Sequence, residues 1–245
     1  MGLIAPVGDD LRDELARKAV ILQDLERHYG TMFDILRDMH ERAYADIAVG
    51  GTKTIVEVAC GTGMAYPLAL RLGLDYTGVD ISETAIAMCC LKFTDGCFVN
   101  APVHRLNMFA DHSFDAVYCS SMLEHIGRVE AAIRELWRLA RHRLDLIFYE
   151  GLGDTRDHVF TFVPYDPTLT PESWGGPYGV KVAVQDHGDR DGRTTGVPVP
   201  GYFMNRFARD PMRRLLNGLP RAKKVEMRNV PHPKHGMRSW VTVRR

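Results

Sequence analysis

Short runs of β-forming residues alternate with helix-forming segments through the middle of the chain. The runs are rich in β-branched and aromatic residues, and the segments between them carry apolar residues at helical spacing. This alternation is typical of an α/β fold, in which right-handed crossovers join the strands of a parallel sheet. The sequence predicts strands at residues 54–59, 75–79, 114–120 and 144–149, and helices between them at 64–72, 82–93 and 128–141.

One more strand of the central sheet is expected before residue 107, where two short runs compete. Either 97–99 or 103–106 could be the extended piece. Near the C-terminus a helix is predicted at 211–216, and two strand-like runs at 224–230 and 237–243 look like an antiparallel pair. Together these elements predict a Rossmann-like, seven-stranded, mostly parallel sheet that ends in an antiparallel pair.

Three further segments surround the predicted sheet. Helices are predicted at 9–27 and 31–48, before the first strand. Residues 151–201 follow the fifth strand, are rich in Gly, Pro, Asp and Thr, and contain few apolar residues. A long irregular segment of this kind commonly covers a binding site, so we expect a lid there. The 245 residues are expected to form a single domain, because no linker separates two cores.

The charges balance overall but are unevenly distributed. The chain has 31 basic and 31 acidic residues, yet residues 206–245 contain twelve basic and two acidic residues, a local net charge of +10. We expect a solvated basic face there, with binding of an anionic substrate as the alternative. The five cysteines lie in apolar stretches and no apolar run is long enough to span a bilayer, so a cytoplasmic protein is expected.

The first predicted strand runs into a turn of small residues, Glu57-Val58-Ala59-Cys60-Gly61-Thr62-Gly63. Such a turn lets a ligand approach the backbone and leads into a helix N-terminus, which indicates a nucleotide-like ligand. A dinucleotide fingerprint needs a third small residue where this chain has Tyr66. A pyrophosphate ligand is therefore disfavoured, and the lysine of a P-loop is also absent.

The second predicted strand leads into Asp80, which places a carboxylate beside the glycine turn. At the carboxyl edge of a sheet such an acid can accept hydrogen bonds from both ribose hydroxyls of a bound nucleoside. The alternative is that Asp80 caps the helix that starts near Ser82. Because the acid and the turn occur together, the sequence favours the ribose interpretation.

With these motifs the sequence resembles the class I S-adenosylmethionine-dependent methyltransferases. The resemblance is to the broad group that contains ubiquinone-biosynthesis O-methyltransferases and many small-molecule methyltransferases. It rests on the order of four motifs and covers about residues 54–245. The motifs are the Glu57-to-Gly63 turn, Gly78-Val79-Asp80-Ile81-Ser82, Ser113-Phe114-Asp115-Ala116-Val117 and Met122-Leu123-Glu124-His125-Ile126.

The resemblance implies S-adenosyl-L-methionine as the cofactor and assigns the residues that bind it. In the family the glycine turn and the end of the fourth strand hold the methionyl part, the acid after the second strand holds the ribose, and residues after the third strand cover the adenine. For the adenine, Asn107 and Met108 are preferred and Asn100 is the alternative. Ala59 stands where the family often has its first glycine. The implied cofactor-binding residues are Glu57, Ala59, Gly61, Gly63, Asp80, Ile81, Asn107, Met108 and Ser120.

The same resemblance places Glu124 and His125 near the reacting methyl group. A histidine, with an unperturbed pKa of about 6.5, suits a general base, and the alternative for His125 is a structural bond to the backbone. Some relatives bind a divalent metal here through Glu-x-x-Glu-His. Ser121 replaces the first glutamate of that motif, so no metal is expected.

The implied activity is methyl transfer to a small-molecule acceptor, at oxygen or nitrogen. Such a transfer is an in-line displacement, in which alignment within a dry pocket supplies much of the acceleration. Two alternatives remain open. One is an RNA methyltransferase that uses the basic C-terminal segment, and the other is a non-catalytic subunit that keeps the fold.

Overall fold

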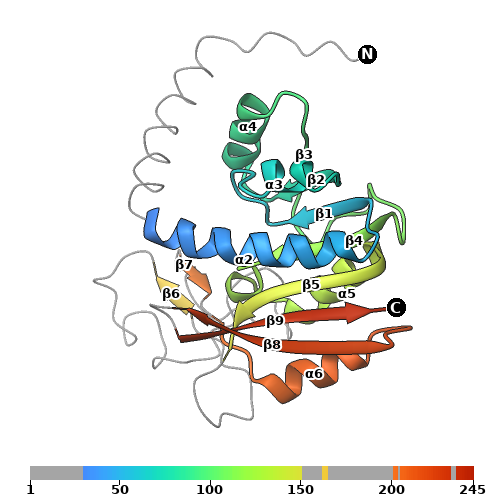
Figure 1. Ribbon diagram of the computed structural model, residues 1–245. Coiled ribbons are helices and arrows are strands. Elements are labelled where there is room, and N and C mark those ends of the chain that lie inside the picture. The colour runs from blue at the N-terminus through green and yellow to red at the C-terminus, as the bar shows by residue number, and fades with distance from the viewer. Residues whose placement is uncertain (1–29, 151–161, 165–200, 204, 233–235) are drawn as a thin grey trace.

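A seven-stranded sheet forms the centre of the molecule (Figure 1). The computed structural model describes residues 30–150, 162–164, 201–203, 205–232 and 236–245. The strand order is β3-β2-β1-β4-β5-β9-β8, with β1 to β5 parallel and with β9 antiparallel to both of its neighbours. The predicted fold class is confirmed. The strands are β1 Thr54–Val58, β2 Asp75–Asp80, β3 Cys97–Asn100, β4 Phe114–Ser120, β5 Ala140–Tyr149, β8 Lys224–His232 and β9 Gly236–Arg244.

The structure decides between the two candidates for the third strand and corrects the start of the fifth. The third strand is β3, so the run 97–99 is extended and the run 103–106 is not. Strand β5 starts at Ala140, four residues before the predicted start, and the preceding helix ends at Leu139. Arg141 and His142 are exposed at the start of β5, while Arg143 is buried. The start of β5 was mispredicted because these polar residues fit the solvent-exposed face of a helix that continues past Leu139.

The helices lie on both faces of the sheet. Helix α2 crosses one face next to α3, and α5 packs on the opposite face (Figure 1). The predicted helix at 9–27 lies outside the described residues. No helix in the described ranges is long and apolar enough to cross a membrane. The helices are α2 Gly30–Val49, α3 Tyr66–Arg71, α4 Glu83–Lys92, the 3-10 helix η1 Leu123–His125, α5 Val129–Leu139 and α6 Arg209–Asn217.

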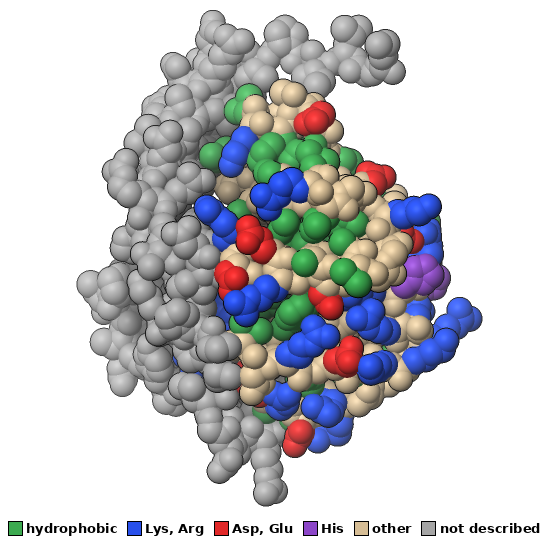
Figure 2. Space-filling model, in the orientation of Figure 1, with side chains coloured by type: hydrophobic (Ala, Val, Ile, Leu, Met, Phe, Trp, Pro, Cys, Tyr) green, Lys and Arg blue, Asp and Glu red, His purple; other side chains and the backbone are tan. Residues whose placement is uncertain are grey.

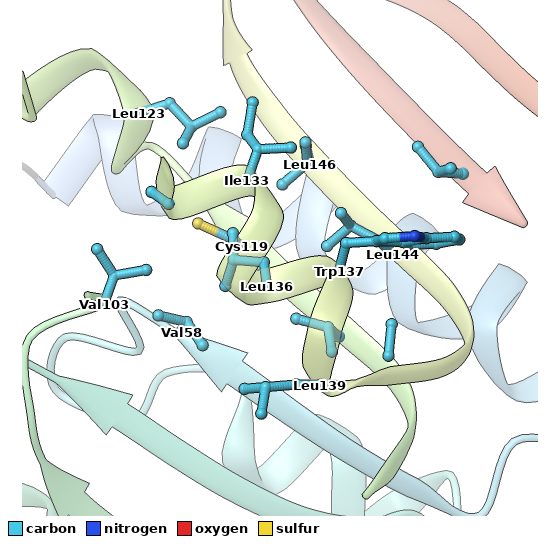
Figure 3. Packing of buried hydrophobic residues seen from close by; sticks show 14 of the residues in the cluster. Val58, Val103, Cys119, Leu123, Ile133, Leu136, Trp137, Leu139, Leu144 and Leu146 are labelled. Carbon is cyan, nitrogen blue, oxygen red and sulfur yellow. The ribbon is translucent and has the colours of Figure 1, made fainter. Parts of the chain in front are cut away.

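Each face of the sheet has its own apolar core. On one face Ile133 and Leu136 of α5 pack against Val58, Cys119 and Leu146 of three neighbouring strands (Figure 3). On the other face the buried residues come from α2, α3 and the strands, and they are Met39, Ala43, Tyr44, Ile47, Ile55, Ala65, Tyr66, Ala69, Leu74, Tyr76, Ala116, Tyr118, Ile147 and Trp240. Burial on both faces explains why consecutive residues of β1, β2 and β4 are buried, rather than every second one.

The segment predicted to be a lid, residues 151–201, lies between two residues that meet at the carboxyl end of β5. Glu150 and Phe207 form a parallel bridge, and the Phe207 N–H donates to the Tyr149 carbonyl. Inside the segment, β6 Phe162–Pro164 pairs antiparallel with β7 Gly201–Phe203, which starts at the last residue of the segment. Residues 151–161 and 165–200 lie outside the described residues, so the lid remains a prediction.

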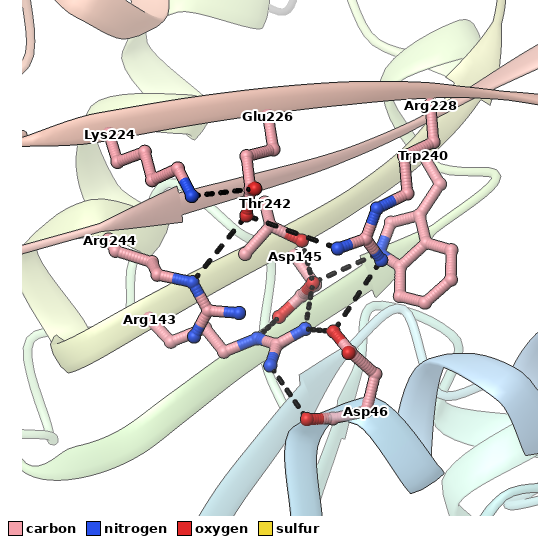
Figure 4. A network of polar contacts seen from close by, with 9 residues as sticks. All are labelled: Asp46, Arg143, Asp145, Lys224, Glu226, Arg228, Trp240, Thr242 and Arg244. Atoms are coloured by element: carbon pink, nitrogen blue, oxygen red, sulfur yellow. Dashed lines mark hydrogen bonds and ion pairs between the residues drawn. The ribbon is translucent and has the colours of Figure 1, made fainter. Parts of the chain in front are cut away.

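A buried polar network ties α2 to the antiparallel end of the sheet (Figure 4). Asp145 of β5 is fully buried and accepts hydrogen bonds from Arg143, Trp240 Nε1 at 3.0 Å and Thr242 Oγ1 at 2.7 Å. Arg143 also pairs with Asp46 of α2. The buried charges are thus paired and hydrogen-bonded, which offsets their desolvation. This network fixes the C-terminal part of α2 over β5 and β9.

The basic C-terminal segment forms a mixed surface rather than a uniformly positive one. Figure 2 shows Lys and Arg side chains interspersed with acidic ones on this side of the molecule. Lys224, Arg228 and Arg244 all pair with Glu226, and Arg228 also pairs with Asp46. Lys224, Arg228 and Arg244 therefore fit the expected solvated face, whereas Arg238 of β9 is buried.

We expect Asp145→Ala to lower the free energy of unfolding by about 3–5 kcal/mol, because it leaves the buried Arg143 with one partner fewer. Thr242→Val removes only one donor to the same carboxylate and should cost about 1 kcal/mol. Urea denaturation of both variants measures these changes. Equal losses in the two variants would contradict a central role of Asp145.

Candidate active site

The glycine turn after β1 adopts a backbone that favours glycine. Ala59, Gly61 and Gly63 have φ angles of 67°, 54° and 72°, in the left-handed region. The Ala59 N–H donates to the Val79 carbonyl at 2.7 Å, which holds the turn against the end of β2. Alanine at φ 67° is strained, and this strain explains why the family often has glycine at the position of Ala59.

Two glycines of the turn meet different surroundings. A Cβ at Gly63 would lie 3.0 Å from Phe93 and 3.1 Å from Cys89, so Gly63 permits close packing of the turn on α4. A Cβ at Gly61 would have no atom within 4 Å. Open space beside Gly61 is what a ligand that approaches the backbone requires.

Asp80 holds this turn through both carboxylate oxygens. Oδ2 accepts from the Gly61 N–H and Oδ1 from the Ser82 N–H, each at 2.8 Å. The N-cap of α4 is Ser82, whose Oγ accepts from the Ala85 N–H at 3.2 Å. The capping alternative for Asp80 is therefore wrong. Each carboxylate oxygen can accept more than one hydrogen bond, so these contacts leave acceptor capacity for a ligand.

The residues proposed to cover the adenine are only partly brought together. Ile81 is 69% exposed beside Asp80, and Asn100 at the end of β3 donates to the carbonyls of Asp80 and Ile81, each at 3.0 Å. Asn107 and Met108 are exposed, but they lie elsewhere. The carbonyls on either side of them, those of Leu106 and Phe109, accept hydrogen bonds from the Arg138 side chain.

Arg138 stands in the last turn of α5, which ends where β5 begins, at the amino edge of the sheet. The loop after β3 has therefore already turned back from the carboxyl edge when it reaches Asn107 and Met108. Asn107 and Met108 therefore lie away from Asp80, whereas Asn100, the alternative for the adenine, lies beside it. Which residue covers the adenine stays a prediction.

Glu57 lies beneath the turn in a buried polar cluster. Its Oε2 accepts from Tyr76 Oη at 2.6 Å and from Tyr44 Oη at 3.1 Å, and its Oε1 lies 3.8 Å from His40 Nδ1. Burial raises the pKa of Glu57 to about 7, although the two tyrosine hydrogen bonds lower it and Asp80 adds a smaller rise. Glu57 is thus enclosed between α2 and the sheet, just before the turn.

Glu124 and His125 are adjacent in sequence but differ in environment. The Glu124 side chain is fully buried, its Oε1 accepts from the Tyr149 N–H at 3.0 Å, and its Oε2 has no partner among the described residues. Burial raises the pKa of Glu124 to about 7, while Arg238 and the Tyr149 N–H lower it. The His125 side chain is exposed, and the backbone N–H of His125 donates to the Met122 carbonyl at 2.8 Å. Ser120 ends β4 just before them and is buried.

Sequence reasoning missed His40, Tyr44, Tyr149 and Arg238, which come from both ends of the chain. Tyr44 reaches Glu57 from α2, and Arg238 of β9 donates to Tyr149 Oη at 2.6 Å. The sequence did contain a signal for Arg238. It is a charged residue in β9, which lies between two other strands, and a charged residue is rarely buried without a partner. The contacts of Tyr44 and His40 give no such signal in the sequence.

We expect Ala59→Gly to raise the free energy of unfolding by roughly 0.5–1 kcal/mol. The substitution removes left-handed strain, and the greater freedom of the unfolded chain offsets part of that gain. Ala132→Gly, inside α5, is the matched control and should lose about 1 kcal/mol. Chemical denaturation distinguishes them, and a loss in both variants would contradict strain at Ala59.

The raised pKa of Glu57 predicts a pH effect on stability. Unfolded Glu57 releases its proton near pH 4.5, whereas the folded protein keeps it until about pH 7. Unfolding therefore releases a proton in this window, and stability falls as pH rises. From pH 5 to pH 8.5, Glu57→Gln should lose roughly 2–3 kcal/mol less than the unsubstituted protein. Denaturation curves at both pH values test this, and parallel losses would show that Glu57 ionises normally.

Residues 56–148, from β1 to β5, match the family model described as a methyltransferase domain. Among curated relatives, the ubiquinone biosynthesis O-methyltransferase of Nitrosomonas europaea is 28% identical over 104 residues, 40% of this chain and 44% of that protein. The protein of the same name from Alkalilimnicola ehrlichii is 29% identical over 126 residues, 49% of this chain and 51% of that protein. The chain thus spans about half the length of these relatives.

Two solved structures have a similar fold. The 1,6-didemethyltoxoflavin-N1-methyltransferase of Burkholderia thailandensis, with bound S-adenosylhomocysteine, gives a TM-score of 0.56 at 19% identity, covering 99% of this chain and 93% of that one. The magnesium protoporphyrin IX methyltransferase of Synechocystis PCC 6803, with bound S-adenosylmethionine, gives 0.60 at 16% identity, covering 99% and 100%. Residues 56–148 therefore match a methyltransferase-domain model, and the chain shares the fold of these two methyltransferases.

Proposed function

We propose that this protein transfers a methyl group from S-adenosyl-L-methionine to a small-molecule acceptor, at oxygen or nitrogen. The observation that carries the proposal is the turn in which Asp80 holds the Gly61 N–H, within the region that matches the methyltransferase model. The proposal takes residues 1–245 as one catalytic domain. Solved structures of similar fold that hold S-adenosylmethionine or S-adenosylhomocysteine support it.

The cofactor would bind along the carboxyl edge of β1, β2 and β4. Gly61 and Gly63 would lie against its methionyl part, close to Ser120, and Asp80 would accept the ribose hydroxyls. Ile81 offers an exposed apolar side chain and Asn100 a nearby amide for the adenine. The cofactor supplies a methyl group on a positively charged sulfur.

The chain itself would align the acceptor and take up its proton. A hydroxyl acceptor must lose a proton, and a base with a pKa near neutral suits this task. Glu124 has this property, and its Oε2 has no hydrogen-bond partner among the described residues. His125 is the other candidate, but its side chain is exposed. We therefore assign proton uptake to Glu124, at Oε2.

The nucleic-acid alternative gains no support from the described residues of β8 and β9. Their basic side chains Lys224, Arg228 and Arg244 are engaged with acidic partners. A small-molecule acceptor is also in keeping with the mixed charge of the face in Figure 2.

We expect Asp80→Ala to weaken binding of S-adenosylhomocysteine by about 10–100-fold, because charge-assisted hydrogen bonds are lost. Asp75→Ala, an exposed acid at the other end of β2, is the matched control and should bind as the unsubstituted protein does. Isothermal titration calorimetry measures both variants, and NAD should give no heat with any of them because Tyr66 replaces the third small residue.

Unchanged affinity in a folded Asp80→Ala variant would overturn the assignment of Asp80. NAD binding as tight as that of S-adenosylhomocysteine would overturn the proposed cofactor.

A further inference from the structure

Arg238 is a buried cation at the carboxyl edge of the sheet. Its side chain is 2% exposed, although its neighbours Ser121 and Tyr149 are only half-buried. It donates from Nη1 to Ser121 Oγ and from Nη2 to Tyr149 Oη, each at 2.6 Å, and its Cζ lies 4.1 Å from the centre of the Tyr149 ring. All of these partners are uncharged.

The guanidinium of Arg238 has no acid within 4 Å in the part of the chain that the structure describes. The charge of Arg238 lowers the pKa of Glu124, but the two side chains form no ion pair. Nε of Arg238 is buried and has no hydrogen-bond partner among the described residues. Two of its five N–H groups thus have acceptors, and donor capacity remains.

The other buried arginine provides the comparison. Arg143 pairs with Asp145 and Asp46, as a buried cation normally does. An unpaired buried charge costs several kcal/mol, so a protein that keeps one commonly supplies its counter-charge from a ligand. On α2, His40 supplies no negative charge: burial and the nearby Arg238 lower its pKa to about 4, so its ring is neutral.

The surroundings of Arg238 point to ligand binding. Ser121 has φ 58°, which is strained for a residue with a side chain, and such strain concentrates at functional sites. Three residues further on, the buried Oε2 of Glu124 also has no partner among the described residues. A donor and an acceptor, both buried and both incompletely bonded, thus stand at the edge where β4 and β5 end.

We propose that Arg238 binds a carboxylate of the methyl acceptor. This inference rests on the proposed function and defines its substrate class: an organic acid that carries a carboxylate besides the hydroxyl or amino group that is methylated. The planar guanidinium matches a carboxylate in shape and charge. The bound carboxylate orients the acceptor, and the group to be methylated then lies on the side of Glu124.

The test uses the full chain saturated with S-adenosylhomocysteine and a panel of hydroxybenzoates and aminobenzoates, each beside its carboxamide. Thermal shift and calorimetry measure binding to the unsubstituted protein, Arg238→Met and the control Arg244→Met, which changes an arginine at the other end of β9. At least one carboxylate should bind about 10–100-fold more tightly than its carboxamide. Arg238→Met should abolish this preference and Arg244→Met should keep it.

Arg238→Lys is a second variant in case Arg238→Met does not fold. It keeps the positive charge and should retain a weaker preference for the carboxylate over the carboxamide. If no carboxylate in the panel binds, or if the preference survives in Arg238→Met, the proposal is wrong. Affinity for S-adenosylhomocysteine, measured separately, should be unchanged in all variants. If the unsubstituted protein does not bind S-adenosylhomocysteine, the proposed function is refuted rather than the role of Arg238.

Discussion

The hydrogen bond from the Gly61 N–H to Asp80 joins the ends of the first two strands, and the proposed site depends on it. The left-handed turn from Ala59 to Gly63 exposes its backbone only while something holds it in place. Asp80 does so through the Gly61 N–H, while Glu57, at the end of β1 just before the turn, is hydrogen-bonded to Tyr44 and Tyr76. The two acids of this region therefore act differently: one is at the edge and available to a ligand, and the other is enclosed as part of the scaffold.

A third acid shows that a family motif can be purely structural. Asp115 accepts from the Lys53 and Thr54 N–H groups, each at 3.0 Å, and from Arg141 at 2.6 Å. These contacts lower the pKa of Asp115, although burial opposes them. Asp115 thus fastens the start of β1 at the amino edge, opposite the proposed site. Motif order located this residue as readily as Asp80, but only the sheet distinguishes their roles.

The sequence predicts the frame of the fold well because strand and helix periodicity are local. Strand β4 has the predicted bounds, and β1 and β2 differ from theirs by one residue. The start of β5 was wrong because Arg143 is buried through pairing with Asp46, a partner 97 residues away. The sequence did not show that Asn107 lies away from Asp80, because spacing along a loop does not reveal where the loop turns back. Arg238 was missed because its partner Ser121 is 117 residues away. Tyr44 was missed because helical spacing does not reveal that its hydroxyl reaches Glu57 of β1.

The antiparallel direction of β9 also determines where the end of the chain lies. Its early residue Arg238 pairs with Tyr149 at the carboxyl edge, so its last residues reach the opposite edge. There Arg245 donates to the carbonyls of Ala140 and Trp137, at 3.0 and 2.8 Å. An affinity tag or fusion partner attached after Arg245 would therefore emerge on the side of the sheet away from Asp80 (Figure 1). Immobilisation through that end leaves the proposed site open to ligands in a surface-binding measurement.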